Sequence, residues 1–416
     1  MSNDKKPAIR FKDYSDDWEQ RKLGELVDRV VRKNTNNEST LPLTISAQYG
    51  LVDQITYFNN RVASRDVSNY YLVLNGEFAY NKSTSDGYPF GAVKRLDLYE
   101  KGVLSTLYII FATKKEQQID SDFLTVFFDT DRWHKGIAER AAEGARNHGL
   151  LNISTEDFFD IDLSIPQNVL EQKQIGTFIR QFDNLITLHQ RKYDKLQNLK
   201  KAMLKKMFPK NGSNVPEIRF KGFTDAWEQR KLYEMCGTFE YGLNAAAKEF
   251  DGKNKYIRIT DIDDASREFL FSDLSSPDIC LDGMSKYLLS RGDIVFARTG
   301  ASVGKTYIYR ENDGVVYFAG FLIRTKVNQD NDAEFVFQST LSPSYEKYIR
   351  ITSQRSGQPG VNAQEYGEYD LFIPSKKEQQ RIGQFLRGID NLIALHQREL
   401  EKLKNIKKAM LEKMFV

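Results

Sequence analysis

The chain has 416 residues, which is too long for one ordinary hydrophobic core, so two to four domains are expected. Aromatic residues make up 12% of it, which is enough to build globular cores and argues against a disordered chain. Its 60 basic and 57 acidic residues nearly cancel, so any basic surface that binds nucleic acid must be local.

The pattern of cysteine, histidine and apolar residues indicates the compartment. Cys236 and Cys280 lie far apart without metal-binding spacing, as expected in a reducing environment. The four histidines form no metal-binding motif. The chain has no apolar run of about 18 residues, and its start, MSNDKKPAIRF, lacks the apolar segment of a signal peptide. We therefore expect a cytoplasmic protein without a metal site in this chain.

The first predicted element occurs twice. Residues 9–23 read IRFKDYSDDWEQRKL, and residues 218–232 read IRFKGFTDAWEQRKL, with 11 of 15 positions identical. Each copy predicts a short strand followed by a helix. We interpret Trp18 and Trp227 as anchors that hold these elements against a globular core, because a buried indole contributes a large apolar area.

The regions after these motifs diverge in sequence but keep a common outline of short strands and turns. Residues 70–82, YYLVLNGEFAYNK, and residues 286–298, KYLLSRGDIVFAR, each predict a strand, a glycine turn and a second strand. Each region ends in a strand that Pro166 or Pro374 terminates just before a long helix.

Two long helices are the strongest prediction. Residues 171–208 and 378–415 lack proline and share 25 of 38 positions, at a constant offset of 207 residues. Apolar residues recur in heptads, which predicts an antiparallel coiled coil about 57 Å long. The predicted seam comprises Ile175, Phe178, Phe182, Leu185, His189 and Leu196 in the first helix and Ile382, Phe385, Ile389, Leu392, His396 and Leu403 in the second.

Three further features of the helices follow from the same pattern. A third apolar line, which includes Ile179 and Leu386, widens the stripe, so that it can pack against more than one partner. We interpret the two seam histidines as polar positions that fix the register rather than as metal ligands. Lys192 matches Glu399, so we expect an ion pair between them if the helices cross at that point.

The repeat defines the predicted organisation. A polar linker, FPKNGSNVPE, follows the first helix and separates two similar halves. We predict a mixed α/β (α+β) fold with an internal pseudo-twofold repeat. Globular domains of strands and short helices occupy residues 1–165 and 211–373, and helical spacers occupy residues 166–210 and 374–416. Because the frame repeats while the inserts differ, the inserts are free to recognise different things.

These motifs together resemble the specificity subunit of type I restriction–modification systems over essentially the full length. The residues that carry the resemblance are IRF…WEQRKL (twice), GDIVFARTG at residues 292–300, and IP…EQ…IG…F…D…LI…HQR (twice). The resemblance implies that each globular domain is a target recognition domain that reads half of a split DNA sequence. It also implies that the helices set the spacing and dock two methylation subunits.

The same resemblance implies a division of labour. The chain itself is expected to be non-catalytic and to hold no cofactor. S-adenosylmethionine, ATP and magnesium belong to partner subunits, which methylate adenine or restrict DNA. The sequence agrees with this expectation: it lacks the Asn/Asp-Pro-Pro-aromatic tetrapeptide of adenine methyltransferases and a nuclease cluster of acidic residues.

Four loops carry side chains suited to DNA. Arginine suits guanine, amides suit adenine, and hydroxyl or lysine donors beside glycine suit phosphate. The candidates are Asn81, Lys82, Ser83, Thr84, Arg146 and Asn147 in the first half and Arg298, Thr299, Ser302, Lys305, Gln354, Arg355 and Gln358 in the second. The same residue types also suit ordinary surface turns.

Two other functions remain as alternatives. Residues 300–306 read GASVGKT, which resembles a phosphate-binding P-loop of a nucleotide-binding enzyme. That motif requires four residues between its glycines and a helix after it, whereas here three residues intervene and TYIYR predicts a strand. We therefore reject nucleotide binding at this loop. The second alternative is a coiled-coil scaffold without DNA binding, which would not need two different globular domains.

Overall fold

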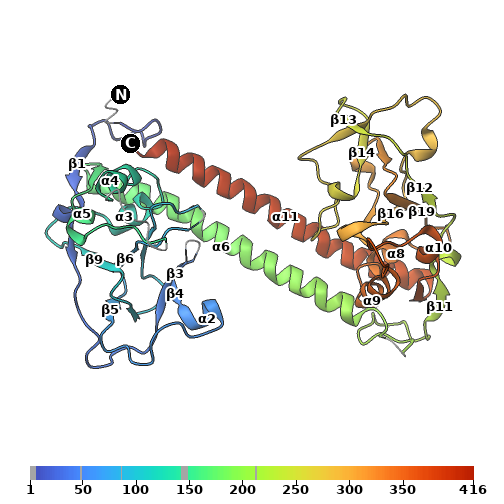
Figure 1. The fold of residues 1–416 in the computed structure, drawn as a ribbon, viewed down its shortest axis with the longest axis horizontal. Helices are drawn as coiled ribbons and strands as arrows, with labels where there is room; N and C mark the ends of the chain where they lie inside the picture. Colours follow the sequence, from blue (N-terminus) through green and yellow to red (C-terminus); the bar gives the residue numbers. More distant parts are fainter. Residues whose placement is uncertain (1–5, 47–48, 86, 142–148, 211–212) are drawn as a thin grey trace. The chain divides into compact units, whose positions relative to one another are not determined.

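The computed structural model describes residues 6–46, 49–85, 87–141, 149–210 and 213–416 (Figure 1). The chain forms two compact units. Unit 1 contains Met1–Leu188 and Leu400–Val416, and unit 2 contains His189–Glu399. Among the described residues, no helix combines the length and the apolar character that crossing a membrane requires.

The globular part of unit 1 is built on a four-stranded antiparallel sheet of order β2-β9-β6-β7. Smaller two-stranded ladders, β1-β10, β3-β4 and β5-β8, surround it. The elements are β1 (Glu19–Lys22), α1 (Leu23–Leu26), β2 (Val27–Arg29), β3 (Leu43–Ser46), β4 (Gly50–Asp53), α2 (Gln54–Phe58), β5 (Tyr71–Leu74), β6 (Phe78–Asn81), β7 (Ala92–Arg95), β8 (Lys101–Leu104), β9 (Ile109–Thr113), α3 (Ser121–Phe127), α4 (His134–Arg140), α5 (Thr155–Phe159) and β10 (Asp162–Ile165).

Unit 2 repeats this plan with the sheet β12-β19-β16-β17 and the ladders β11-β20, β13-β15 and β14-β18. Its elements are β11 (Glu228–Lys231), α7 (Leu232–Met235), β12 (Glu240–Tyr241), β13 (Ala247–Glu249), β14 (Lys255–Ile257), η1 (Ile259–Asp261), β15 (Ser275–Pro277), η2 (Ser285–Tyr287), β16 (Asp293–Ala297), η3 (Gly300–Ser302), β17 (Thr306–Ile308), η4 (Glu311–Asp313), β18 (Val316–Phe318), β19 (Leu322–Lys326), α8 (Ala333–Ser339), α9 (Pro343–Thr352), α10 (Ala363–Gly367) and β20 (Asp370–Ile373). The long helices are α6 (Val169–Lys206) and α11 (Lys376–Met414).

The strand–turn–strand prediction is confirmed in unit 1 and partly wrong in unit 2. In unit 1, β5 and β6 flank a turn in which Gly76 adopts a φ of 85°. In unit 2 only the second strand, β16, forms, and the expected first strand is wrong because η2 occupies its start. The Asp293 carboxylate accepts a hydrogen bond from the backbone N–H of Ser290 at 2.8 Å, so a turn takes up the residues before β16. The strands before Pro166 and Pro374 are confirmed as β10 and β20.

The two tryptophans anchor their cores as predicted. Trp18 is buried and packs edge-on against Phe123 of α3 and against Phe415, which follows α11. Trp227 is likewise buried and packs against Phe335 of α8 and against Phe208, which follows α6. Each core therefore includes the end of a long helix that begins in the other half of the sequence.

A buried carboxylate fixes the start of each long helix. In unit 1, Glu171 accepts hydrogen bonds from the guanidinium of Arg10 at 2.6 and 2.8 Å. In unit 2, Glu378 accepts the same pair from Arg219, both at 2.7 Å. Both carboxylates are almost fully buried, so the repeated motif IRF serves to bring an arginine to the first turn of the helix.

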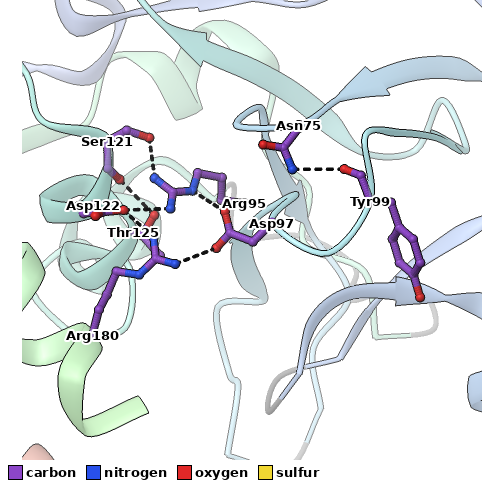
Figure 2. A network of polar contacts seen from close by, with 8 residues as sticks. All are labelled: Asn75, Arg95, Asp97, Tyr99, Ser121, Asp122, Thr125 and Arg180. Carbon is purple, nitrogen blue, oxygen red and sulfur yellow. Dashed lines mark hydrogen bonds and ion pairs between the residues drawn. The ribbon is translucent and has the colours of Figure 1, made fainter. Parts of the chain in front are cut away.

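A second polar network attaches α6 to the globular part of unit 1. Figure 2 shows Arg95 and Arg180 pointing at the same two carboxylates, Asp97 and Asp122. Arg95 donates to Asp97, Asp122 and the hydroxyl of Ser121, each at 2.7 Å, and Arg180 pairs with both carboxylates. Because Asp122 lies in the first turn of α3, this network fixes the direction of α6 relative to that helix.

The two long helices are antiparallel within each unit, as predicted. In unit 1, Lys407 pairs with Asp183 at 2.6 Å and with Asp129 at 2.9 Å. Burial opposes ionisation of Asp129, but the charges of Lys94 and Lys407 outweigh it and lower its pKa to about 2. In unit 2, Lys200 pairs with Asp390, the residue that matches Asp183 at the offset of 207. The two helices therefore make matched ion pairs in both units.

The predicted seam is partly wrong. Ile175, Ile382 and Ile389 are buried, and Phe178, Phe182, His189, Leu196, His396 and Leu403 are half-buried. Leu185, Phe385 and Leu392 are exposed, by 43%, 37% and 46%, so they lie outside the seam. In the third apolar line, Ile179 and Leu386 are fully buried instead. Each helix packs against its partner and also against a globular core, which rotates its buried face toward this third line.

The position at which the helices meet also corrects a prediction. In unit 2, the Nδ1 atoms of His189 and His396 lie 3.0 Å apart, so the matched histidines face each other, as their interpretation as register positions requires. Lys192 and Glu399 both lie three residues further along. Because the helices are antiparallel, three residues on each separate the two side chains by about 9 Å along the axis. Because the helices meet at His189 and His396 instead, the prediction of an ion pair between Lys192 and Glu399 is wrong.

Candidate nucleic-acid interface

In unit 1, two predicted loops come together at the end of β6. The backbone of Lys82 accepts a hydrogen bond from Leu151, and Thr84 donates from both its N–H and its hydroxyl to the carbonyl of Gly149. Ser83 forms an isolated β-bridge with Leu150. The loop after β6 is therefore hydrogen-bonded to residues 149–151, the segment that precedes α5.

Unit 2 forms the same junction at the end of β16. Gly300 donates to the carbonyl of Pro359 at 3.0 Å, and Val361 donates to the carbonyl of Arg298 at 2.9 Å. Thr299 forms an isolated β-bridge with Gly360. Because β6 and β16 occupy the same place in their sheets, the predicted loops meet at equivalent positions in both units.

Arg298 is the best-defined side chain of the unit 2 junction. Its guanidinium lies 5.2 Å from the ring centre of Tyr241 and 5.7 Å from that of Phe321, which are 46% and 57% exposed. Its buried Nε has no hydrogen-bond partner within the described residues. Two cation–π contacts thus hold the arginine in one place at the surface. A planar guanidinium held in this way suits bidentate recognition of a base edge or a phosphate.

Tyr241 and Phe321 are residues that sequence reasoning missed. Tyr241 belongs to β12, and Phe321 immediately precedes β19, the strand between β12 and β16. Both therefore reach Arg298 through strand pairing, which the local sequence around them does not reveal. The only signal was their place in the segments EYGLN and AGFLI, where an aromatic residue stands beside a glycine.

The other unit 2 candidates differ in how accessible their polar atoms are. Gln354 and Gln358 are exposed, and Thr299 and Ser302 are half-buried. The side chain of Gln358 lies 2.9 Å from where a Cβ of Gly300 would stand, and Gly300 has a φ of +73°, so a larger residue there would displace it. Arg355 is exposed, but its guanidinium already bonds Glu365 and the carbonyl of Thr352.

Lys305 differs most from the expectation of a free donor. It is 8% exposed, and its amine donates to the carbonyl of Ile262 at 3.1 Å and pairs with Asp264 at 2.5 Å. The loop GASVGKT forms η3 and then β17, so no helix follows it and its lysine is turned inward. This geometry differs from a P-loop and agrees with the rejection of nucleotide binding there.

The unit 1 candidates are polar, but among the described residues they include no arginine that aromatic contacts fix in place, as they fix Arg298. Asn81 accepts a hydrogen bond from the N–H of Ser83, which is ordinary turn chemistry. Lys82 donates to the carbonyl of Ile153 at 3.4 Å, and Ser83 is exposed. Arg146 and Asn147 lie outside the described residues. Within the described part of the chain, no three His, Cys, Asp or Glu side chains gather as a metal site requires.

Comparison with known proteins agrees with this arrangement. Residues 224–405 match the family described as "Type I restriction modification DNA specificity domain". The MjaVIII specificity subunit of Methanocaldococcus jannaschii is 23% identical over 412 residues, covering 95% of this chain and 91% of the relative. The putative MjaX specificity subunit of the same organism is 21% identical over 413 residues, covering 95% and 92%.

The fold agrees as well. A solved S subunit of a type I restriction–modification system from M. genitalium has a TM-score of 0.63 at 14% identity, covering 99% of both chains. The predicted fold class, two strand-rich domains with two long packed helices, is thereby confirmed. Residues 224–405 therefore carry a type I restriction modification DNA specificity domain, and nearly the full length of the chain is similar to specificity subunits of type I restriction–modification systems.

Proposed function

We propose that each globular domain, residues 1–165 and 211–373, reads one half of a bipartite DNA target. The observation that carries this proposal is the matched junction of loops at the ends of β6 and β16. The backbone frame is the same in both units, whereas the side chains on it differ. A protein that recognises two different half-sequences with one repeated scaffold needs this combination of a constant frame and variable side chains.

The helical spacers, residues 166–210 and 374–416, set the distance between the two half-sites and dock two methylation subunits. Docking is supported by apolar side chains that the helices leave uncovered. Leu185 and Leu188 are exposed in unit 1, and their matches Leu392 and Leu395 are exposed in unit 2. Two matched apolar patches suit two copies of one partner. Those partners and the restriction subunits supply S-adenosylmethionine, ATP and magnesium, whereas this chain holds no cofactor.

The proposal is tested by exchanging one domain. Residues 24–165 are replaced by the corresponding region of a specificity subunit with a different target, and the methylated motif of the assembled complex is mapped by sequencing. We expect one half of the motif to change and the other half and the spacer length to persist. The matched control replaces residues 233–373, which should change only the other half. A change of both halves in either exchange would contradict the proposal that each globular domain reads one half of the target.

A second prediction concerns Arg298. If Arg298 forms a bidentate hydrogen bond with a guanine, Arg298→Gln removes that contact. Discrimination at one base position should then weaken by about 1–3 kcal/mol. Arg298→Lys should lose most of this discrimination as well, since an ammonium ion cannot form the fork. Binding to duplexes that vary one position at a time measures the effect. The control is Arg291→Gln, which removes an exposed arginine at the opposite end of β16. Uniform weakening across all sequences would instead assign Arg298 to a phosphate.

A further inference from the structure

A cleft in unit 2 shares the loop 301–305 with the candidate interface but does not include Arg298. It measures about 780 Å³ and is lined by the 264–268 turn, the loop 301–305, α9, and one face each of α6 and α11. Several charged side chains line it, and many of them neutralise one another. Lys200 pairs with Asp390, and Lys305 pairs with Asp264.

Arg267 is the exception in this cleft. Its guanidinium is half-buried and forms neither a hydrogen bond nor an ion pair within the described part of the chain. Burial is the dominant influence and lowers the pKa of Arg267 from its ordinary value, although Asp264 and Glu346 act against it. A half-buried guanidinium without a protein partner is free to pair with an anion in the cleft.

The backbone presents Arg267 in an unfavourable conformation. Its φ is 59°, in the left-handed region that glycine and asparagine usually occupy. The turn is nevertheless well defined, because the Asp263 carboxylate accepts hydrogen bonds from the N–H groups of Ala265 and Ser266 and from the hydroxyl of Ser266. A strained position occupied by arginine rather than glycine points to a use for its side chain.

The wall of the cleft offers a second unsatisfied group. Tyr345 of α9 is 2% exposed, and its hydroxyl has no hydrogen-bond partner within the described residues. Because that oxygen is itself buried, Arg267 remains the accessible donor in the cleft. Lys201 and Arg350 also line the cleft and add positive charge, against Glu268 and Glu346. After the two internal ion pairs are set aside, three cations face two anions.

We propose that this cleft binds a phosphate group, with the Arg267 guanidinium as its principal donor. A phosphate offers several acceptor oxygens and matches the fork of arginine. The group can belong to the DNA backbone beside the bases that unit 2 reads, in which case the inference rests on the proposed function. It can equally belong to a free phosphate compound, in which case the site is independent of DNA.

The test uses Arg267→Gly in the full chain. Glycine removes the guanidinium and suits a φ of 59°, so this variant should fold at least as well as the original. In the first arm, inorganic phosphate is added to the full chain at constant ionic strength. At about ten times its Kd, phosphate should raise the Tm of the original protein by about 3–6 °C and leave that of Arg267→Gly unchanged.

The second arm uses the complex with its methylation subunits and a duplex that contains the target. Loss of one phosphate contact should reduce the slope of log K against log salt by about 0.9. Arg291→Gln serves as the control in both arms and should leave both readouts unchanged. The proposal is overturned if Arg267→Gly behaves like the original protein in both arms. If the complex shows no sequence preference for DNA, the proposed function fails, and the phosphate arm still decides the inference.

Discussion

Replacing Glu171 with alanine is expected to destabilise unit 1 by about 3–5 kcal/mol, the cost of leaving a buried charge without its partner. The carboxylate is 1% exposed and accepts three hydrogen bonds, two from Arg10 and one from the indole of Trp18 at 3.3 Å. Its removal leaves a guanidinium that is only slightly exposed and an unsatisfied indole N–H at the same place. The start of α6 would then lose its link to the N-terminal segment.

Unit 2 provides a matched comparison for this prediction. Glu378 bonds Arg219 in the same way, but the buried indole N–H of Trp227 has no hydrogen-bond partner among the described residues. Glu378→Ala should therefore cost less than Glu171→Ala, by about 1 kcal/mol, the value of one hydrogen bond. For the same reason, Trp18→Phe should cost more than Trp227→Phe.

The measurement must report on each unit separately. Hydrogen exchange followed by mass spectrometry does so, because peptides from α3 and α8 lie in different units. Glu19→Ala is the control, since that side chain is 38% exposed and its ion pair with Arg21 at the surface contributes little. Equal losses for Glu171→Ala and Glu19→Ala would contradict the interpretation that the buried pair holds the helix in place.

The repeat explains why much of the fold was predictable. Two copies of a proline-free heptad pattern identify α6 and α11, and a proline before each marks where the preceding strand ends. The face that each helix buries was not predictable, because three apolar lines compete for it. Leu185 and Ile179 are equally apolar, and only the packing of the globular core decides that Ile179 is covered.

The candidate site was predictable only in part, for a related reason. Arg298 could be selected from the chemistry of its loop, but its aromatic neighbours Tyr241 and Phe321 come from strands that tertiary pairing places beside it. Lys305, like Arg298, is a basic residue close to a glycine in this loop, yet its side chain points inward to Ile262 and Asp264. The segment that supplies these partners, which also carries Arg267, lies in the divergent part of the sequence. The repeat therefore gave no guide to it.

The largest functional effect is expected from lengthening the helices. We predict that four residues inserted after Arg191 and four after Arg398 lengthen the unread spacer of the DNA target by one or two base pairs. These exposed, matched positions lie in helical segments without proline, so strong helix formers there should continue both helices. Four residues add about 6 Å, and two base pairs add about 6.8 Å of duplex. The bases read on either side should remain the same.

Four residues are preferable to a full heptad because rotation must match as well as length. An insertion of four residues turns an α-helix by about 40° beyond one full revolution, whereas two base pairs turn DNA by about 70°. Both turns are right-handed, so most of the rotation is followed. Seven residues keep the seam in register but turn the helix by about 20° in the opposite sense. The corresponding three base pairs turn DNA by about 100°.

The methylated motif of the assembled complex gives the result directly. The original motif should lose its methylation, and a motif with the same half-sites and a longer spacer should gain it. The control is a four-residue insertion after Gly252, which lies in an exposed turn of unit 2 where an added Cβ would have no neighbour within 4 Å, and it should leave the motif unchanged. An active double-insertion variant with the original spacer would show that the distance between half-sites is set elsewhere than in α6 and α11.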